Sequence, residues 1–568
     1  VLESYLKANP ADGQAMTLLA GALMSKGQHA RASSLMHQAL QLTDAPEFRS
    51  VLGLSLIRGG QAAAGMAELE AAYKKDPRQT PAATALVGYY LRGRQNDKAV
   101  AMAESLINQQ PGNAGFHNLL GMAKGQSGKL AESKAAFEQA LRLNPALVSP
   151  KLNLARIDIA TKAYDAAAAR LTAILKADEK NTEAMFEMAL LSDRRGQAAD
   201  TQRWLEKATD LSGPKETRWG LALSDFHLRN GRAGPALDAV KKVSAKAPDD
   251  LAVLLAYARA QLANGDVTGA KSNLNTATRV ADYNAASQVQ IAMLQLAAKN
   301  PGGAAYSLEK ALSGQPDFLP AQALMTEVEL RQGEPANAEK RARDILARHP
   351  KLALGHSLLG DIAQSRGQPT QAVEAYRRAY QTEPSTNTFM RLFGALANQD
   401  GGKAAIELAQ QWTRLHPKDA RAQKALANTY ARSGQFALAK TSYEILVALT
   451  PDDSDALNNL ANVLLRLKDP AAVKMAEQAV AKNPNDANAI DTLGWALFQA
   501  GQTERALQYL RDARLRQPGN PEIRYHLAVV LALTGRKAEA INELESALKD
   551  GQGFETATEA AALLKALK

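Results

Sequence analysis

Helix-breaking residues recur along this chain at an almost constant spacing. Successive prolines are 33 or 34 residues apart, or two such steps apart, and they are Pro77, Pro111, Pro145, Pro214, Pro248, Pro316, Pro350, Pro384, Pro417, Pro451, Pro484 and Pro518. Counted from Pro10 to Gln552, the chain holds sixteen periods. A chain of this length would ordinarily divide into several unrelated domains, whereas a constant period predicts one small structural unit repeated in tandem.

The same residue types return at the same places within each period. In the copy that ends at Pro145, Leu120 and Gly121 are followed by Gly128 and Phe137. Apolar residues three and four positions apart predict two amphipathic helices. The first glycine lets these helices approach closely, and the second supplies the left-handed backbone that ends the first helix. Because one hairpin cannot bury both apolar stripes, successive hairpins must stack.

This pattern resembles the tetratricopeptide repeat over nearly the whole chain. The resemblance implies an all-α, right-handed superhelical solenoid of about sixteen helical hairpins, with about 33 helices in all. Residues 1–10 are expected to be the remnant of a preceding repeat, residues 11–552 the sixteen tandem repeats, and residues 553–568 a C-terminal capping helix.

Some repeats depart from the pattern at their hairpin turns. Two are one residue short, near Asp400-Gly401 and near Lys468. Residues 161–163 and 299–302 lack the turn glycine or displace it. We expect looser joints at these last two places, because a turn without glycine must find its geometry elsewhere.

Composition and motifs argue against catalysis. There is no cysteine, and no two of the eight histidines have the four-residue spacing of a helical zinc motif, so we interpret them as scattered surface residues. Phosphate-binding loops and nucleophile elbows are also lacking. We predict a protein that is not an enzyme and has no cofactor. A net charge of +10 in 568 residues is too small an excess to indicate nucleic-acid binding, and no apolar run is long enough to span a membrane.

In this family the first helix of each repeat usually lines a concave groove. That register predicts a ligand groove across residues 388–500, formed by Arg391, Asn398, Arg421, Lys424, Asn428, Asn458, Asn459, Asn462, Asp491, Trp495 and Phe498. Equivalent positions farther upstream are more often apolar, as at Leu255, Leu262, Met293 and Leu296. Such amides and cations have no packing role in a groove and can bond a peptide backbone or sugar hydroxyls. Replacing Lys424 and Asn428 should therefore weaken a ligand about tenfold.

Lys424, Asn428 and Asn459 have the spacing of three members of the carboxylate clamp by which some tetratricopeptide proteins hold a peptide C-terminus. Asn488 and Thr492 replace the basic residues expected next, so a general groove for extended ligands is favoured. Two other basic clusters are expected to be solvated outer surfaces, and they comprise Lys340, Arg341, Arg343, Arg348 and Lys351, and Arg511, Arg514, Arg516 and Arg524.

The last three repeats carry a more specific likeness. Residues 485–495, 520–528 and 560–565 resemble the C-terminus of long bacterial tetratricopeptide lipoproteins of the PrsT type, which are associated with exosortase and PEP-CTERM protein sorting and with exopolysaccharide biosynthesis. The resemblance implies a periplasmic scaffold anchored by lipid through a segment before Val1. Its partners would be other proteins and an acidic exopolysaccharide. The alternative is a peptide-binding adaptor or co-chaperone, periplasmic or cytoplasmic, that uses the groove at residues 388–500.

Overall fold

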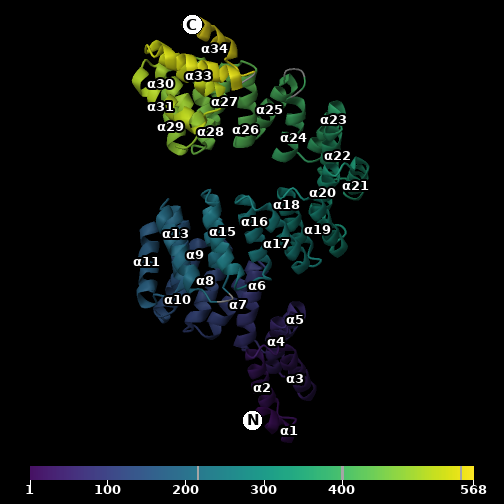
Figure 1. The fold of residues 1–568 in the computed structure, drawn as a ribbon. Coiled ribbons are helices and arrows are strands. Elements are labelled where there is room, and N and C mark those ends of the chain that lie inside the picture. The colour runs from purple at the N-terminus through teal and green to yellow at the C-terminus, as the bar shows by residue number, and fades with distance from the viewer. Residues whose placement is uncertain (214–215, 398, 400–401, 551–552) are drawn as a thin grey trace. The chain divides into compact units, whose positions relative to one another are not determined.

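The computed structural model describes residues 1–213, 216–397, 399, 402–550 and 553–568. Throughout this part of the chain the regular secondary structure is helical, in 34 α-helices (Figure 1). The number exceeds the expected 33 by the short N-terminal helix α1 (Leu2–Ala8). Pro214, Asn398, Asp400, Gly401 and Gln552, which the sequence analysis names, lie outside the described residues.

Residues Val1–Ala281 form one compact unit, called unit 1. Its helices after α1 are α2 (Gly13–Ser25), α3 (His29–Leu42), α4 (Pro46–Arg58), α5 (Ala62–Lys75), α6 (Thr80–Arg92), α7 (Asn96–Gln109), α8 (Ala114–Gln126), α9 (Leu130–Leu143), α10 (Val148–Ala160), α11 (Tyr164–Ala177), α12 (Thr182–Arg194), α13 (Ala198–Leu211), α14 (Arg218–Arg229), α15 (Ala233–Ser244), α16 (Leu251–Ala263) and α17 (Val267–Val280).

Residues Asp282–Lys568 form a second compact unit, called unit 2. Its helices are α18 (Ala285–Ala297), α19 (Pro301–Gly314), α20 (Leu319–Arg331), α21 (Pro335–Arg348), α22 (Leu354–Ser365), α23 (Pro369–Thr382), α24 (Thr386–Ala397), α25 (Lys403–Leu415), α26 (Ala420–Arg432), α27 (Phe436–Leu449), α28 (Ser454–Arg466), α29 (Ala471–Lys482), α30 (Ala487–Gln499), α31 (Thr503–Arg516), α32 (Pro521–Leu533), α33 (Lys537–Asp550) and α34 (Ala557–Leu567). The units divide at a repeat boundary where the sequence has no proline.

Within each unit the helices form stacked hairpins, which confirms the all-α repeat solenoid. Each even-numbered helix from α2 to α32 packs against the helix that follows it, and most also touch the next even-numbered helix. We call the even-numbered helices the inner helices. None of the described helices has the length and apolar character needed to cross a membrane.

Close packing explains the small residues in the repeat. A methyl group added to Gly121 of α8 would lie 2.5 Å from the ring of Phe137 on α9. The equivalent distance from Gly360 of α22 to the ring of Tyr376 on α23 is 2.4 Å. Both rings are buried. Alanine at either glycine would therefore push the two helices of a hairpin apart.

Every hairpin turn contains one residue in the left-handed backbone conformation. In twelve turns it is glycine, at residues 27, 60, 128, 196, 231, 265, 333, 367, 402, 434, 501 and 535, and in four it is Arg94, Lys162, Lys299 or Lys468. At Lys162 the amide of Ala163 donates to the Asp158 carbonyl at 2.8 Å, as the amide of Lys129 donates to Lys124 at 2.9 Å beside Gly128. The turns at 161–163 and 299–302 thus keep the left-handed residue without glycine, because Lys162 and Lys299 adopt that conformation themselves, and the looser joints expected there stay a prediction. Near Lys468 the missing residue shortens α29 to 12 residues.

Candidate functional site

An open cavity of about 1110 Å³ lies within unit 2. Its walls come from the inner helices α24, α26, α28, α30 and α32, from α27, and from residues 555–556. We call this cavity the groove. Predicted residues that line it are Arg421, Lys424, Asn428, Asn459, Asn462 and Trp495, and polar lining residues that the sequence analysis did not name as groove residues include Arg432, Arg466, Glu522, His526, Glu555 and Thr556.

The repeat sets these side chains in rows. Asp419 and Asp453 precede α26 and α28, and their carboxylates accept the amides of Ala422 and Ala456 at 3.1 and 3.0 Å, which fixes where each helix begins. Each inner helix begins and ends at equivalent residues of its repeat. Side chains at the same position of successive inner helices therefore lie next to one another. One such row holds Asn428, Asn462 and Trp495, each six residues before a left-handed turn residue.

Four cations face the groove, and two of them have no acidic partner. Arg421 donates to the side-chain oxygen of Asn387 at 3.1 Å but pairs with no carboxylate in the described residues. Arg432 is exposed, and no described side chain forms an ion pair or hydrogen bond with it. Lys424 has its ammonium nitrogen 3.2 Å from an Asp453 oxygen. Arg466 pairs with Glu555. The end of the groove near α26 therefore carries uncompensated positive charge.

Asn428 and Lys424, which were predicted to line the groove, bond to other residues of the protein. The Asn428 oxygen accepts a hydrogen bond from the hydroxyl of Tyr443, a buried residue whose pKa is raised by burial to about 12. Although burial raises the pKa of Asp453, hydrogen bonds from the Ala456 amide and from Lys424 lower it overall. Asn428 and Lys424 thus have a role within the fold, and Arg421 and Asn462 also bond to neighbouring side chains, Asn387 and Thr492.

Of the other five predicted residues, Asn398 lies outside the described residues, and the remaining four do not line the groove. Arg391 pairs with Asp361. The side-chain oxygen of Asn458 is buried without a hydrogen-bond partner in the described residues. Asp491 is buried, and Phe498 packs against the apolar core.

A histidine that we expected at the surface belongs to the groove wall. The Nδ1 atom of His526 lies 2.8 Å from an Asp491 oxygen, and its ring stacks on Trp495 at 4.3 Å. Its side chain is 17% exposed, and His227 in unit 1 is buried, so the surface interpretation is wrong for both. His526 occupies the same repeat position as Asn459, nine residues before the left-handed turn residue. Extending the groove register by one repeat would have found it.

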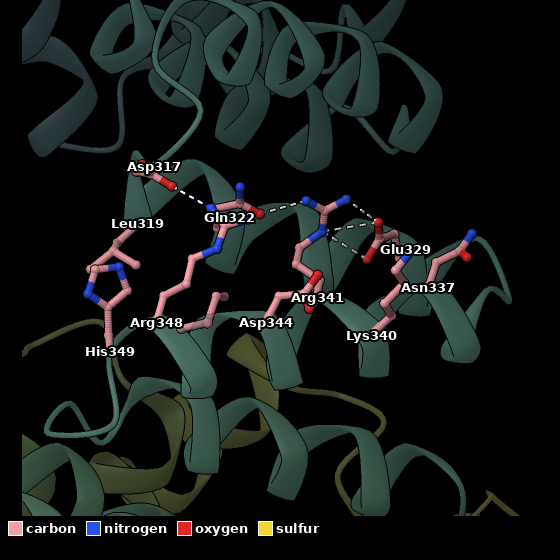
Figure 2. Close-up of a pocket in the computed structure, with 11 residues that line it drawn as sticks. Asp317, Leu319, Gln322, Glu329, Asn337, Lys340, Arg341, Asp344, Arg348 and His349 are labelled. Carbon is pink, nitrogen blue, oxygen red and sulfur yellow. Dashed lines mark hydrogen bonds and ion pairs between the residues drawn. The ribbon is translucent and has the colours of Figure 1, made fainter.

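A smaller cavity of about 370 Å³ lies against α20 and α21 (Figure 2). Arg341 donates to Glu329 and to Gln322, each at 2.6 Å, and Arg348 donates to Asp317 at 2.6 Å. Glu329 is buried. The expectation of a solvated basic surface is wrong for Arg341, and also for Arg524, whose side chain is 12% exposed and pairs with Glu543.

The chemistry that the groove offers is that of hydrogen-bond donors beside aromatic rings. No group of three histidine, aspartate or glutamate side chains among them is arranged to hold a metal ion. The groove offers guanidinium, ammonium and amide donors beside the rings of Trp495 and His526. Such a surface can hold an extended acidic or hydrogen-bonding ligand.

Stacked hairpins with a groove along their inner helices define a helical-repeat binding scaffold. Two sequence profiles described as tetratricopeptide repeat match the chain, one at residues 126–189, 295–362 and 497–567 and the other at residues 357–420 and 424–487. Together they cover more than half of the sequence. The protein belongs to the tetratricopeptide-repeat family.

One curated relative and two solved structures illustrate this similarity. The TPR repeat-containing protein PA4667 of Pseudomonas aeruginosa is 25% identical over 152 residues, and the match covers 26% of each protein. The structure of the APC/C hetero-tetramer Cut9-Hcn1 aligns with 86% of this chain and 96% of its own at 16% identity and a TM-score of 0.36. The structure of Naa15/Naa10 bound to HypK-THB aligns with 100% of this chain and 93% of its own at 14% identity and a TM-score of 0.35.

Proposed function

We propose that this protein is a non-catalytic scaffold whose groove binds an extended, acidic segment of a partner protein. The observation that carries the proposal is the pair Arg421 and Arg432, which face the groove without a carboxylate partner in the described part of the chain. Some inner-helix arginines pair with acids, as Arg156 does with Glu187 at 2.6 Å, and others do not, but Arg421 and Arg432 are unpaired arginines that line this groove. Cations that the fold leaves unpaired are available to a ligand.

The form of the groove favours an extended ligand. Its lining residues come from five successive inner helices, so a bound segment would pass several equivalent side-chain rows. Amides such as Asn459 and Asn462 can bond a peptide backbone, while the arginines meet its carboxylates. Each charge-assisted hydrogen bond contributes roughly 1.5 to 3 kcal/mol. Two arginines should therefore make a measurable difference between the affinities for an acidic and a neutral segment.

An acidic exopolysaccharide is the second candidate ligand, because uronate carboxylates and sugar hydroxyls use the same donors. A direct test is fluorescence anisotropy of the whole protein with labelled deca-glutamate, deca-glutamine and an oligogalacturonate. The proposal expects saturable binding of deca-glutamate and none of deca-glutamine. Binding of the oligogalacturonate alone would favour the polysaccharide. Equal binding of deca-glutamate and deca-glutamine would remove the role of charge.

We propose further that the protein works in the bacterial periplasm, anchored to a membrane by lipid and serving a PEP-CTERM sorting and exopolysaccharide system. Support comes from the likeness of residues 485–495 and 520–528 to lipoproteins of that kind. Immunoblotting of periplasmic, membrane and cytoplasmic fractions tests this placement. Recovery in the cytoplasm alone would instead support the adaptor or co-chaperone.

A further inference from the structure

The segment before the last helix forms part of the groove wall. Phe554 packs against the apolar cluster that includes residues of α32. The Thr556 amide and hydroxyl both donate to Glu522, at 3.1 and 2.7 Å. These contacts hold Glu555 between two anchored neighbours. Its carboxylate pairs with Arg466 of α28, which is 89 residues earlier in the chain.

Arg466 and Arg432 are equivalent residues of successive repeats. Each lies two residues before the left-handed turn residue, Lys468 or Gly434, and both line the groove. They differ in that Arg466 has an acidic partner, whereas Arg432 has none among the described residues. That partner comes from the chain's own C-terminal segment and not from a neighbouring inner helix.

We propose that Glu555 occupies a subsite for a second carboxylate of the ligand, and that an acidic segment must displace it from Arg466 to fill the groove. This inference rests on the proposed function. Arg432 and Arg466 line the same groove and hold equivalent places on successive inner helices. One acidic segment can therefore reach Arg432 and Arg466 together.

The contact is suited to displacement. The side chains of Arg466 and Glu555 are 54% and 70% exposed, and an exposed ion pair contributes little to stability. The anchors at Phe554 and Thr556 are independent of the Glu555 carboxylate, so α34 can stay in place when the carboxylate is released. A ligand with one carboxylate would bind without meeting this competition.

The test is the affinity of the full chain for labelled deca-glutamate in four variants. Glu555→Gln should tighten binding about two- to five-fold, because it frees Arg466 at little cost. Arg466→Gln should weaken binding, and adding Glu555→Gln to Arg466→Gln should have no further effect. Glu545→Gln is the matched control, because Glu545 forms an exposed ion pair of 2.7 Å with Lys568 and does not line the groove.

The outcomes separate this inference from the proposed function. If deca-glutamate binds the wild type but Glu555→Gln does not tighten it, the competition is refuted and the acidic groove stands. Equal tightening by Glu545→Gln, or by Glu555→Gln in the Arg466→Gln background, would show an effect of net charge and refute the subsite. Binding by Glu555→Gln but not by the wild type would support the strongest form of the competition. Failure of every variant to bind would overturn both proposals.

Discussion

Arginines have different surroundings on the inner helices α10, α12 and α14 of unit 1 and on α26 of unit 2. In unit 1, Glu183 of α12 lies between Arg156 of α10, at 3.2 Å, and Arg218 of α14, at 2.6 Å. Glu187 of α12 also pairs with Arg156, at 2.6 Å. In the groove of unit 2, Arg421 and Arg432 face the same kind of surface with no carboxylate beside them in the described residues. The unit 1 charges pair with acids of adjacent inner helices, whereas Arg421 contacts α24 through the neutral side chain of Asn387 and Arg432 has no partner in the described residues.

By sequence, the equivalent positions farther upstream are more often apolar, and the structure adds where the charged residues among them lie. Met293 is exposed and Leu255 is buried, and along α10, α12 and α14 the ion pairs occur together with the apolar cluster that includes Leu152 and Leu191. A charged side chain that forms an ion pair with a neighbouring helix contributes to the stability of the fold. A charged side chain without an acidic partner in the fold can instead bond to a ligand.

The largest expected effect is on stability. Arg156→Ala should lower the free energy of unfolding by about 2 kcal/mol, because it leaves Glu187, whose side chain is 4% exposed, without its partner. Arg432→Ala should change it by less than about 0.5 kcal/mol. Urea unfolding followed by circular dichroism gives both values. Similar losses for the two variants would mean that Arg432 also supports the fold.

A smaller effect is expected from salt, which should weaken ligand binding in the groove of unit 2 more than it changes the stability of unit 1. Raising NaCl from about 0.05 to 0.5 M should weaken deca-glutamate binding by about tenfold, since exposed charges are screened over a few ångströms at high salt. The unfolding of unit 1 should respond less, because the Glu187 carboxylate is buried. Anisotropy and urea titrations at each salt concentration test this. Binding unaffected by salt would argue that apolar contacts dominate.

The smallest expected effect is an opposite dependence on pH. Burial raises the pKa of Glu187, although Arg156 opposes the shift. The stability of the wild type relative to Glu187→Gln should therefore fall as pH rises from the ordinary glutamate value, about 4.3, to the raised one. The pKa of Asp453 is lowered overall, because the hydrogen bonds from Ala456 and Lys424 outweigh its burial.

The stability of the wild type relative to Asp453→Asn should accordingly rise as pH increases from the lowered pKa to the ordinary aspartate value, about 3.9. Unfolding titrations of the wild type, Glu187→Gln and Asp453→Asn between about pH 3 and 6 measure both slopes. Slopes of the same sign would contradict the different roles assigned to these two carboxylates.

The repeat pattern predicts the hairpins and the rows of the groove, because equivalent positions of a periodic structure must stack. It therefore places Arg421, Lys424 and Asn428 on one surface. It does not predict what each side chain touches. The hydrogen bond from Tyr443 to Asn428 depends on side-chain conformation across a hairpin, and the pairing of Glu555 with Arg466 depends on the path of the chain after the last repeat.

These contacts also change the best mutational test. Lys424 and Asn428 already have partners within the fold, so replacing them alters stability as well as binding. Arg421 and Arg432 are better targets. Arg341 is unsuitable as an outer control because it bonds the buried Glu329. Arg343 and Arg378 are suitable, since both are exposed and each pairs only with an acid four residues away, at 2.7 and 2.6 Å.

The most direct test of the acidic groove is the dissociation constant of labelled deca-glutamate for three full-length proteins: the wild type, Arg421→Gln/Arg432→Gln, and Arg343→Gln/Arg378→Gln. Both double variants remove the same charge. The groove variant should bind at least about tenfold more weakly than the wild type, and the control should stay within about twofold. Equal loss in the two variants would show that deca-glutamate follows net charge, and unchanged binding by the groove variant would contradict the assignment of the site.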